Sequence, residues 1–305
     1  MSRDAAGMSA CATLLDYTEL MLPLVLLFWQ MGEHQAALEA YKQHRFPEAA
    51  AHFTEALKTE QPDSPDYRES VLLLGQTLFL QSKYAEAIPW LEKATSGQAP
   101  PAEASYMLGN ACILTQQSDR AVQAFAKLFQ VPPKSAAAHL TTAQMMLHKD
   151  VDAEAAKQAK LALEIDPHIP EAHFLLGEIA MGHADLDEAI TELNQEIAIN
   201  PGYSMAHYRL GDAYSRREDW EHAMAPLERS VWLNPNYSGP FILLGKGYLK
   251  RKEFANAEGV LRHALRLDPQ NLSAHYLLGQ TLMQEGKVDE AKKEMAKWQE
   301  LKGPN

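Results

Sequence analysis

Residues 204–237 read SMAHYRLGDAYSRREDWEHAMAPLERSVWLNPNY, and their pattern predicts the architecture of the chain. Leu210 and Tyr214 lie four positions apart, so they share one face of a predicted first helix. Residues 216–219 are all polar, which predicts a turn after that helix. Hydrophobic spacing close to 3.6 residues resumes after the turn, as in an amphipathic helix. The stretch therefore predicts two helices joined by a short turn.

The second helix of this stretch carries Ala223 and Leu227 on its inner face. It is expected to end before Asn234-Pro235, because proline lacks a backbone donor and disfavours helix in the residue before it. Gly211 of the first helix and Ala223 of the second are small, which lets two helix backbones approach closely. We therefore expect the two helices to pack against each other.

The same plan recurs every 34 residues along the chain. Glycine marks the first helix at 75, 109, 177, 211, 245 and 279, with Ala143 in the remaining place. An alanine follows each of these positions after twelve residues, and proline recurs at 133, 167, 201, 235 and 269. A unit of this kind cannot bury its apolar face alone, so neighbouring units must stack. We expect eight units over residues 30–305, starting at 30, 68, 102, 136, 170, 204, 238 and 272.

Leu-Gly pairs, each followed by an aromatic residue or leucine, an alanine and a terminal proline, resemble the tetratricopeptide repeat. Leu176-Gly177, Leu210-Gly211 and Leu244-Gly245 are examples, whereas Thr142-Ala143 departs from the pattern. The resemblance implies an all-α, right-handed superhelical solenoid of antiparallel helix pairs. It also implies that first helices line a concave groove that holds a protein or peptide partner.

Two rows of side chains on the first helices are candidates for that groove. The fifth place of successive units holds Leu72, Tyr106, Leu140, Phe174, Tyr208, Ile242 and Tyr276. One helical turn later stand Gln76, Asn110, Gln144, Glu178, Asp212, Lys246 and Gln280, with Lys250 one further turn along. Amides both donate to and accept from a peptide backbone, and tyrosine offers contact area with a polar tip. Glu178 and Asp212 are expected to add negative charge, and Lys246 and Lys250 positive charge. Alternatively, the fifth-place side chains merely pack between first helices.

A subset of the tetratricopeptide repeat proteins clamps the C-terminal carboxylate of chaperones. That clamp needs lysine at the fifth place of its first unit, where Leu72 or Tyr106 stands here. Asn110 alone is not enough for such a clamp. We therefore expect no role in binding chaperone tails.

Composition limits the classes of partner. The formal net charge is −12, and an acidic surface repels phosphates, so nucleic acid is not an expected partner. Cys11 and Cys112 provide no disulfide framework. A reducing, cytoplasmic location is the simpler interpretation, with export as the alternative.

Histidine recurs at the 34-residue spacing as His139, His173, His207 and His275. Equivalent atoms of neighbouring units lie about 8–10 Å apart, whereas zinc ligands lie about 2 Å from the ion. The row is therefore expected to pack rather than to bind metal. No metalloprotease or nucleophile-elbow motif occurs. We expect neither an enzyme nor a cofactor.

Two side chains depart from the small residue usual at their repeat position, Glu196 and Trp298. A partly buried carboxylate needs a partner, and we expect Glu196 to reach the next unit near His207. Trp298 is expected either to cover the C-terminal edge or to mediate self-association there.

Residues 20–29, LMLPLVLLFW, are apolar but shorter than the roughly 20 residues of a spanning helix. The segment is interpreted either as a helix that caps the first unit or as a signal or anchor segment. Three functions remain open: a scaffold or adaptor, an exported or membrane-tethered protein in envelope assembly, and a regulatory or substrate-recruiting module for an enzyme on another chain.

Overall fold

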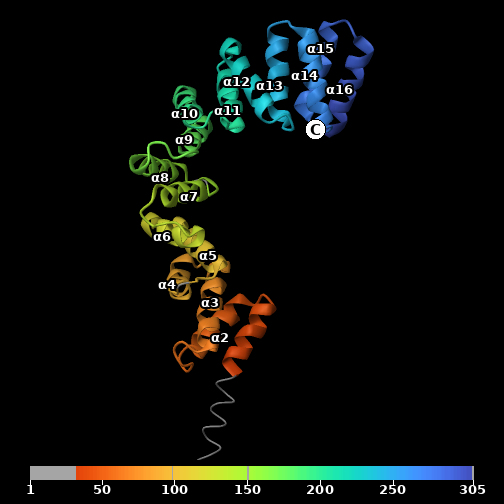
Figure 1. Ribbon diagram of the computed structural model, residues 1–305. Helices are drawn as coiled ribbons and strands as arrows, with labels where there is room; N and C mark the ends of the chain where they lie inside the picture. The colour runs from red at the N-terminus through yellow and green to blue at the C-terminus, as the bar shows by residue number, and fades with distance from the viewer. Residues whose placement is uncertain (1–31, 98, 150, 304–305) are drawn as a thin grey trace, which may run out of the picture. The chain divides into compact units, whose positions relative to one another are not determined.

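The structure is a computed structural model that describes residues 32–97, 99–149 and 151–303 (Figure 1). The chain forms two compact units, one up to Ala138 and the other from His139 onwards. All regular secondary structure of the described residues is helical, which confirms the all-α repeat array. The predicted segment 20–29 lies outside the described residues. Among the helices within them, none is both long and apolar enough to cross a membrane.

The described part of the first unit begins with helical residues 32–42. It continues with α2 (Phe46–Ala56), α3 (Pro65–Leu80), α4 (Tyr84–Ala94), α5 (Ala102–Leu114) and α6 (Ser118–Phe129), and α7 (Ala136–Leu147) begins in it. The second unit holds the rest of α7, then α8 (Asp152–Ile165), α9 (Ala172–Gly182), α10 (Leu186–Ile199), α11 (Ser204–Arg216), α12 (Trp220–Leu233), α13 (Ser238–Lys250), α14 (Phe254–Leu267), α15 (Leu272–Gln284) and α16 (Val288–Lys302).

The stretch 204–237 folds as predicted. It forms α11 and α12, and α12 ends at Leu233, directly before Asn234-Pro235. The side chain of Asp219 caps the start of α12 by accepting from the His222 N–H. The turn between the two helices needs a left-handed residue, and Glu218 adopts φ 59° there. The equivalent residues Ser82, Gln116, Ala184, Lys252 and Gly286 also have positive φ.

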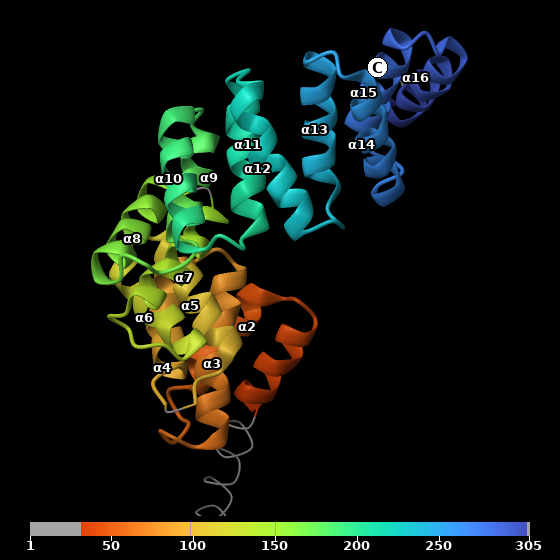
Figure 2. The same ribbon diagram turned by 45° about the horizontal axis from the view of Figure 1, so that its top comes forward.

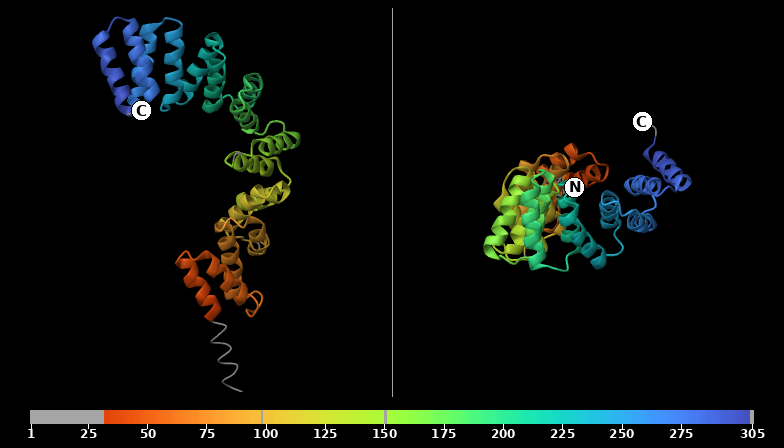
Figure 3. Two further views of the ribbon diagram at one scale, coloured as in Figure 1. Left: turned by 180° about the vertical axis from the view of Figure 1, so that it is seen from behind. Right: turned by 90° about the horizontal axis from the view of Figure 1, so that it is seen from above.

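In the second unit, consecutive helices contact each other from α8 to α16 (Figures 2 and 3). First helices also contact one another, α9 with α11, α11 with α13, and α13 with α15. Among α10, α12, α14 and α16, no pair of second helices makes contact of similar extent. The first helices therefore lie closer together than the second helices, which places them on the inner side of this unit.

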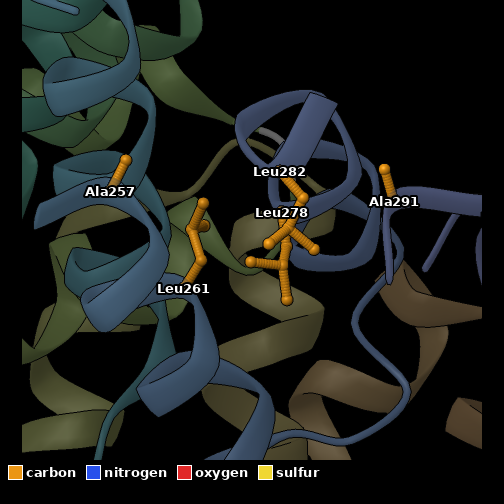
Figure 4. Packing of buried hydrophobic residues seen from close by; sticks show 5 residues of the cluster. All are labelled: Ala257, Leu261, Leu278, Leu282 and Ala291. Carbon is orange, nitrogen blue, oxygen red and sulfur yellow. The ribbon is translucent and has the colours of Figure 1, made fainter. Parts of the chain in front are cut away.

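The core is a seam of small and large side chains between neighbouring helices. Leu261 of α14 lies beside Leu278 and Leu282 of α15, and all three are buried (Figure 4). A Cβ atom on Gly245 would lie 2.4 Å from the Leu261 Cγ, so this close approach of α13 and α14 requires glycine. The prediction that small residues let the helix backbones approach is confirmed here.

Ala143, which departs from the glycine pattern, comes with a matching change sixteen residues later. The equivalents of Ala159 are large in other repeats, namely Leu91, Phe125, Leu193, Leu227 and Leu261. Ala143 and Ala159 are both fully buried. The added methyl group at one position is thus compensated by the smaller side chain at the other.

Candidate partner-binding surface

The fifth-place aromatic rings of the second unit pack against a second set of aromatic rings. Phe174 meets Tyr203 edge to face at a centroid distance of 5.0 Å, and Tyr208 meets Tyr237 in the same way at 5.2 Å. Burial is the main cause that raises the pKa of Tyr203 to about 12 and also raises the pKa of Tyr208. The fifth-place residues therefore serve packing and surface at once. Tyr203 and Tyr237 were not among the predicted site residues, although their 34-residue spacing is visible in the sequence.

The acidic members of the polar row do not present free negative charge. Arg209 of α11 pairs with Glu178 of α9, with Nε 2.7 Å from Oε1 and Nη2 donating to Oε2 at 2.9 Å. Burial raises the Glu178 pKa, and the Arg209 charge opposes that shift. Asp212 accepts from the Arg216 Nη2 at 3.0 Å. The prediction that Glu178 and Asp212 add negative charge to the groove is wrong, because arginines on the same surface neutralise both carboxylates.

The basic members of the row remain without carboxylate partners among the described residues. Lys246 is half-buried, with its Nζ 5.3 Å from the centre of the Trp220 ring. Gly247 makes room for this ring and for Met224, since a Cβ there would lie 2.7 Å from the Met224 Sδ. Lys250 is exposed at the end of α13. This part of the second unit therefore carries uncompensated positive charge.

The predicted amides fall into two groups. In the second unit, the Gln144 amide donates to Glu171 at 3.1 Å and the Gln280 amide donates to the Tyr276 hydroxyl at 2.9 Å, both near the surface. In the first unit, by contrast, Gln76 is 5% exposed and Asn110 is 2% exposed. The Asn110 amide donates to the Tyr106 carbonyl of its own helix. Because they are buried, Gln76 and Asn110 are not part of the candidate surface. Tyr106 itself is exposed.

Comparison with known proteins gives the family. Models described as tetratricopeptide repeat match residues 34–104, 153–204, 174–238, 248–302 and 102–135, and one of them alone covers more than half of the chain. The chain belongs to the tetratricopeptide repeat family. Its membership supports a general role as a protein-interaction scaffold. No curated protein matches the chain.

Solved structures of tetratricopeptide repeat proteins share the fold. MamA from Desulfovibrio magneticus RS-1 is 23% identical, with a TM-score of 0.51 over 55% of this chain and 94% of that one. PilF from Pseudomonas aeruginosa is 20% identical, with a TM-score of 0.52 over 65% of this chain and 88% of that one. At these identities the similarity describes the fold and not a shared partner.

The histidine row is built into individual repeats. His139 pairs with Gln158 at 2.8 Å, and His173 and His275 pair with Glu192 and Glu294 at 2.6 Å. Each partner lies nineteen residues after its histidine, on the second helix of the same repeat. In the described part of the chain, no group of three histidine, cysteine or acidic side chains could hold a metal ion.

His207 differs because Pro226 stands where the other histidines have their partner. Its Nε2 donates to the Pro201 carbonyl at 3.1 Å. Burial lowers the His207 pKa below 6.5, and the Arg229 charge contributes to the same shift.

Acid is therefore expected to destabilise the fold through His207. As the pH drops below 6.5, His207 binds a proton more readily in the unfolded chain than in the folded chain. The free energy of unfolding therefore falls between pH 6.5 and the lower pKa of the folded state. His207→Phe, which copies Phe241 of the next repeat, should flatten this loss in urea denaturation at several pH values. The exposed His168→Ala control should keep the wild-type slope, and an unchanged slope in His207→Phe would contradict the assignment.

Glu196 is fully buried and paired, but not with the next unit as predicted. Its two carboxylate oxygens accept from the Glu171 N–H, each at 2.9 Å, and Oε2 also accepts from the Phe174 N–H at 3.3 Å. These N–H groups belong to the start of α9 in the same repeat. The prediction of a contact near His207 is wrong, because the first turn of α9 offers unpaired donors and a favourable dipole to a buried carboxylate.

Trp298 is half-buried at the last helix pair. Its ring lies 5.3 Å from the Tyr276 ring, and the Lys302 Nζ lies 5.3 Å from its centre. Trp298 thus covers one side of Tyr276, a fifth-place residue that keeps 38% exposure. Self-association at this edge stays a prediction.

Proposed function

We propose that this protein is a non-catalytic scaffold that binds a peptide or protein segment on the first-helix face of its second unit. The observation that carries the proposal is the row Phe174, Tyr208 and Tyr276, held by the neighbouring rings of Tyr203, Tyr237 and Trp298. Rings held in place lose little conformational entropy when a partner covers them, which favours binding. Exposed aromatic side chains are also enriched where proteins meet.

The charge of this face favours an acidic segment. Arg209 and Arg216 already neutralise Glu178 and Asp212, so Lys246 and Lys250 remain available to a partner. The chain as a whole carries a net charge of −12, which makes this positive position unusual for its surface. Opposite charge accelerates encounter and selects between partners more than it adds affinity.

Selection of a random displayed peptide library on the full chain tests the proposal. Enriched peptides are expected to be acidic with apolar or aromatic residues. The double variant Lys246→Gln and Lys250→Gln should lower their affinity about tenfold, a change of about 1.4 kcal/mol, as measured by fluorescence anisotropy.

Lys252→Gln is the matched control, because Lys252 lies exposed in the turn just after α13. It should leave the affinity unchanged at equal salt. Peptides that bind the double variant as tightly as the wild type would overturn the proposed surface.

A further inference from the structure

A pocket of about 780 Å³ opens in the first unit, between the start of α3 and the loop that follows α4. Its apolar wall includes Pro65, Val71, Leu72 and Pro101. Its charged residues are Asp63, Arg68, Glu69 and Lys93. This volume lies in the range of sites that take small molecules or side chains. It lies outside the first-helix face of the second unit described above.

The pocket lies beside a position at which other repeats carry an apolar side chain. Gly97 lines it, and the residues at the same repeat position elsewhere are Val131, Ile165, Ile199, Leu233 and Leu267. Val131 and Leu267 pack against buried residues of their own repeat and of the next one. A Cβ atom on Gly97 would meet nothing within 4 Å. Ile165, by contrast, is 51% exposed. The space that Val131 and Leu267 occupy in their repeats is thus open beside Gly97.

A second replacement enlarges the same space. Pro101 and Leu72 line the pocket, and they occupy the repeat positions at which Tyr237 packs on Tyr208. Two other repeats thus fill this place with a tyrosine ring of their own, the second being Tyr203 against Phe174. A tyrosine ring therefore fits the position that is open beside Leu72 and Pro101.

The charged residues of the pocket are unevenly satisfied. Glu69 lies 3.3 Å from the His34 Nε2, so part of its charge faces that ring. Lys93 donates to the Tyr67 hydroxyl, and its Nζ lies 4.6 Å from the centre of that ring. Neither Lys93 nor Arg68 has an ion-pair partner among the described residues. Asp63 also lines the pocket and has no ion-pair partner in the described part of the chain, so two free cations face one free carboxylate. This excess of positive charge beside an apolar pocket complements an aromatic residue with acidic neighbours.

We propose that this pocket receives an aromatic side chain of a protein partner, flanked in the partner's sequence by acidic residues. The proposal rests on the function of the chain as a protein-binding scaffold, but not on the first-helix face of the second unit. The aromatic side chain takes the place that Tyr237 occupies beside Tyr208. Arg68 and Lys93 meet the flanking carboxylates.

The test uses the full chain and the peptide acetyl-Glu-Tyr-Glu-amide as the probe, followed by amide NMR shifts. Titration is expected to shift the signals of residues 67–72 and 93–97, and shifts among residues 204–303 report the separate second-unit face. Replacing tyrosine by alanine in the peptide should weaken binding about tenfold. Reversing the flanking charges to lysine should weaken it by a similar factor.

Gly97→Leu is the decisive variant, because it restores the residue type of the other repeats in open space and is not expected to strain the fold. It should abolish the shifts of residues 67–72 and 93–97. The control Gly202→Leu, in the turn between α10 and α11, should keep them. Retained binding in Gly97→Leu would overturn the proposal. So would nuclear Overhauser contacts from the Trp29 ring to Leu72 in the peptide-free chain, which would assign the pocket to the chain's own apolar segment. The double variant of Lys246 and Lys250 should keep the shifts of residues 67–72 and 93–97, so failure of the two proposals can be distinguished.

Discussion

Replacing Phe125 with alanine is expected to lower the free energy of unfolding of the first unit by about 3–5 kcal/mol. The Phe125 side chain is fully buried on α6. A Cβ atom on Gly109 would lie 2.4 Å from the Phe125 Cζ, so the ring lies directly over the backbone of α5. Gly109 has no side chain that could move into the space left by the ring. The cavity should therefore remain largely open, which places the loss at the upper end for such substitutions.

Phe129→Ala is the matched control for this variant. Phe129 belongs to the same helix but is 43% exposed, so its truncation should cost well under half as much. Urea denaturation gives the free energies. Hydrogen exchange should show the loss concentrated in α5 and α6, since repeats contact only their neighbours. Equal losses in the two variants, or loss of protection spread evenly over both units, would contradict this account of the core.

Replacing Glu196 with alanine is expected to destabilise the second unit by about 2–3 kcal/mol. The buried carboxylate is the acceptor for the backbone N–H groups of Glu171 and Phe174 at the start of α9. Alanine would leave these donors without that acceptor, and it would remove a negative charge from the positive end of the helix dipole. Hydrogen exchange of the first turn of α9 should accelerate first.

Glu196→Gln separates the hydrogen bonds from the charge. It keeps one acceptor oxygen and is expected to recover part of the stability lost in Glu196→Ala. The adjacent Gln195 is exposed on α10, so Gln195→Ala should change the unfolding free energy by less than about 0.5 kcal/mol. A Glu196→Ala variant as stable as Gln195→Ala would show that the buried carboxylate does not hold α9.

Periodicity determined the helical architecture of this protein. The positions of Gly211, Ala223 and Pro235 predicted where α11 and α12 lie and where α12 ends. Such features depend on contacts within one repeat, which the 34-residue spacing records directly. Even the departure at Ala143 left the register intact, because Ala159 compensates for it.

Which polar side chains remain available to a partner depends on the packing between repeats. The Arg209–Glu178 pair joins two repeats, and Glu196 turns back toward α9 rather than forward to His207. The buried state of Gln76 and Asn110 also depends on packing that their repeat position does not reveal. Side-chain direction and charge pairing act over a few ångströms in space, between residues about 20 to 35 positions apart in the chain. The repeat spacing of the sequence thus predicts the helices. The pocket beside Gly97 and the uncompensated charges of Lys246 and Lys250, by contrast, depend on how neighbouring repeats pack in space.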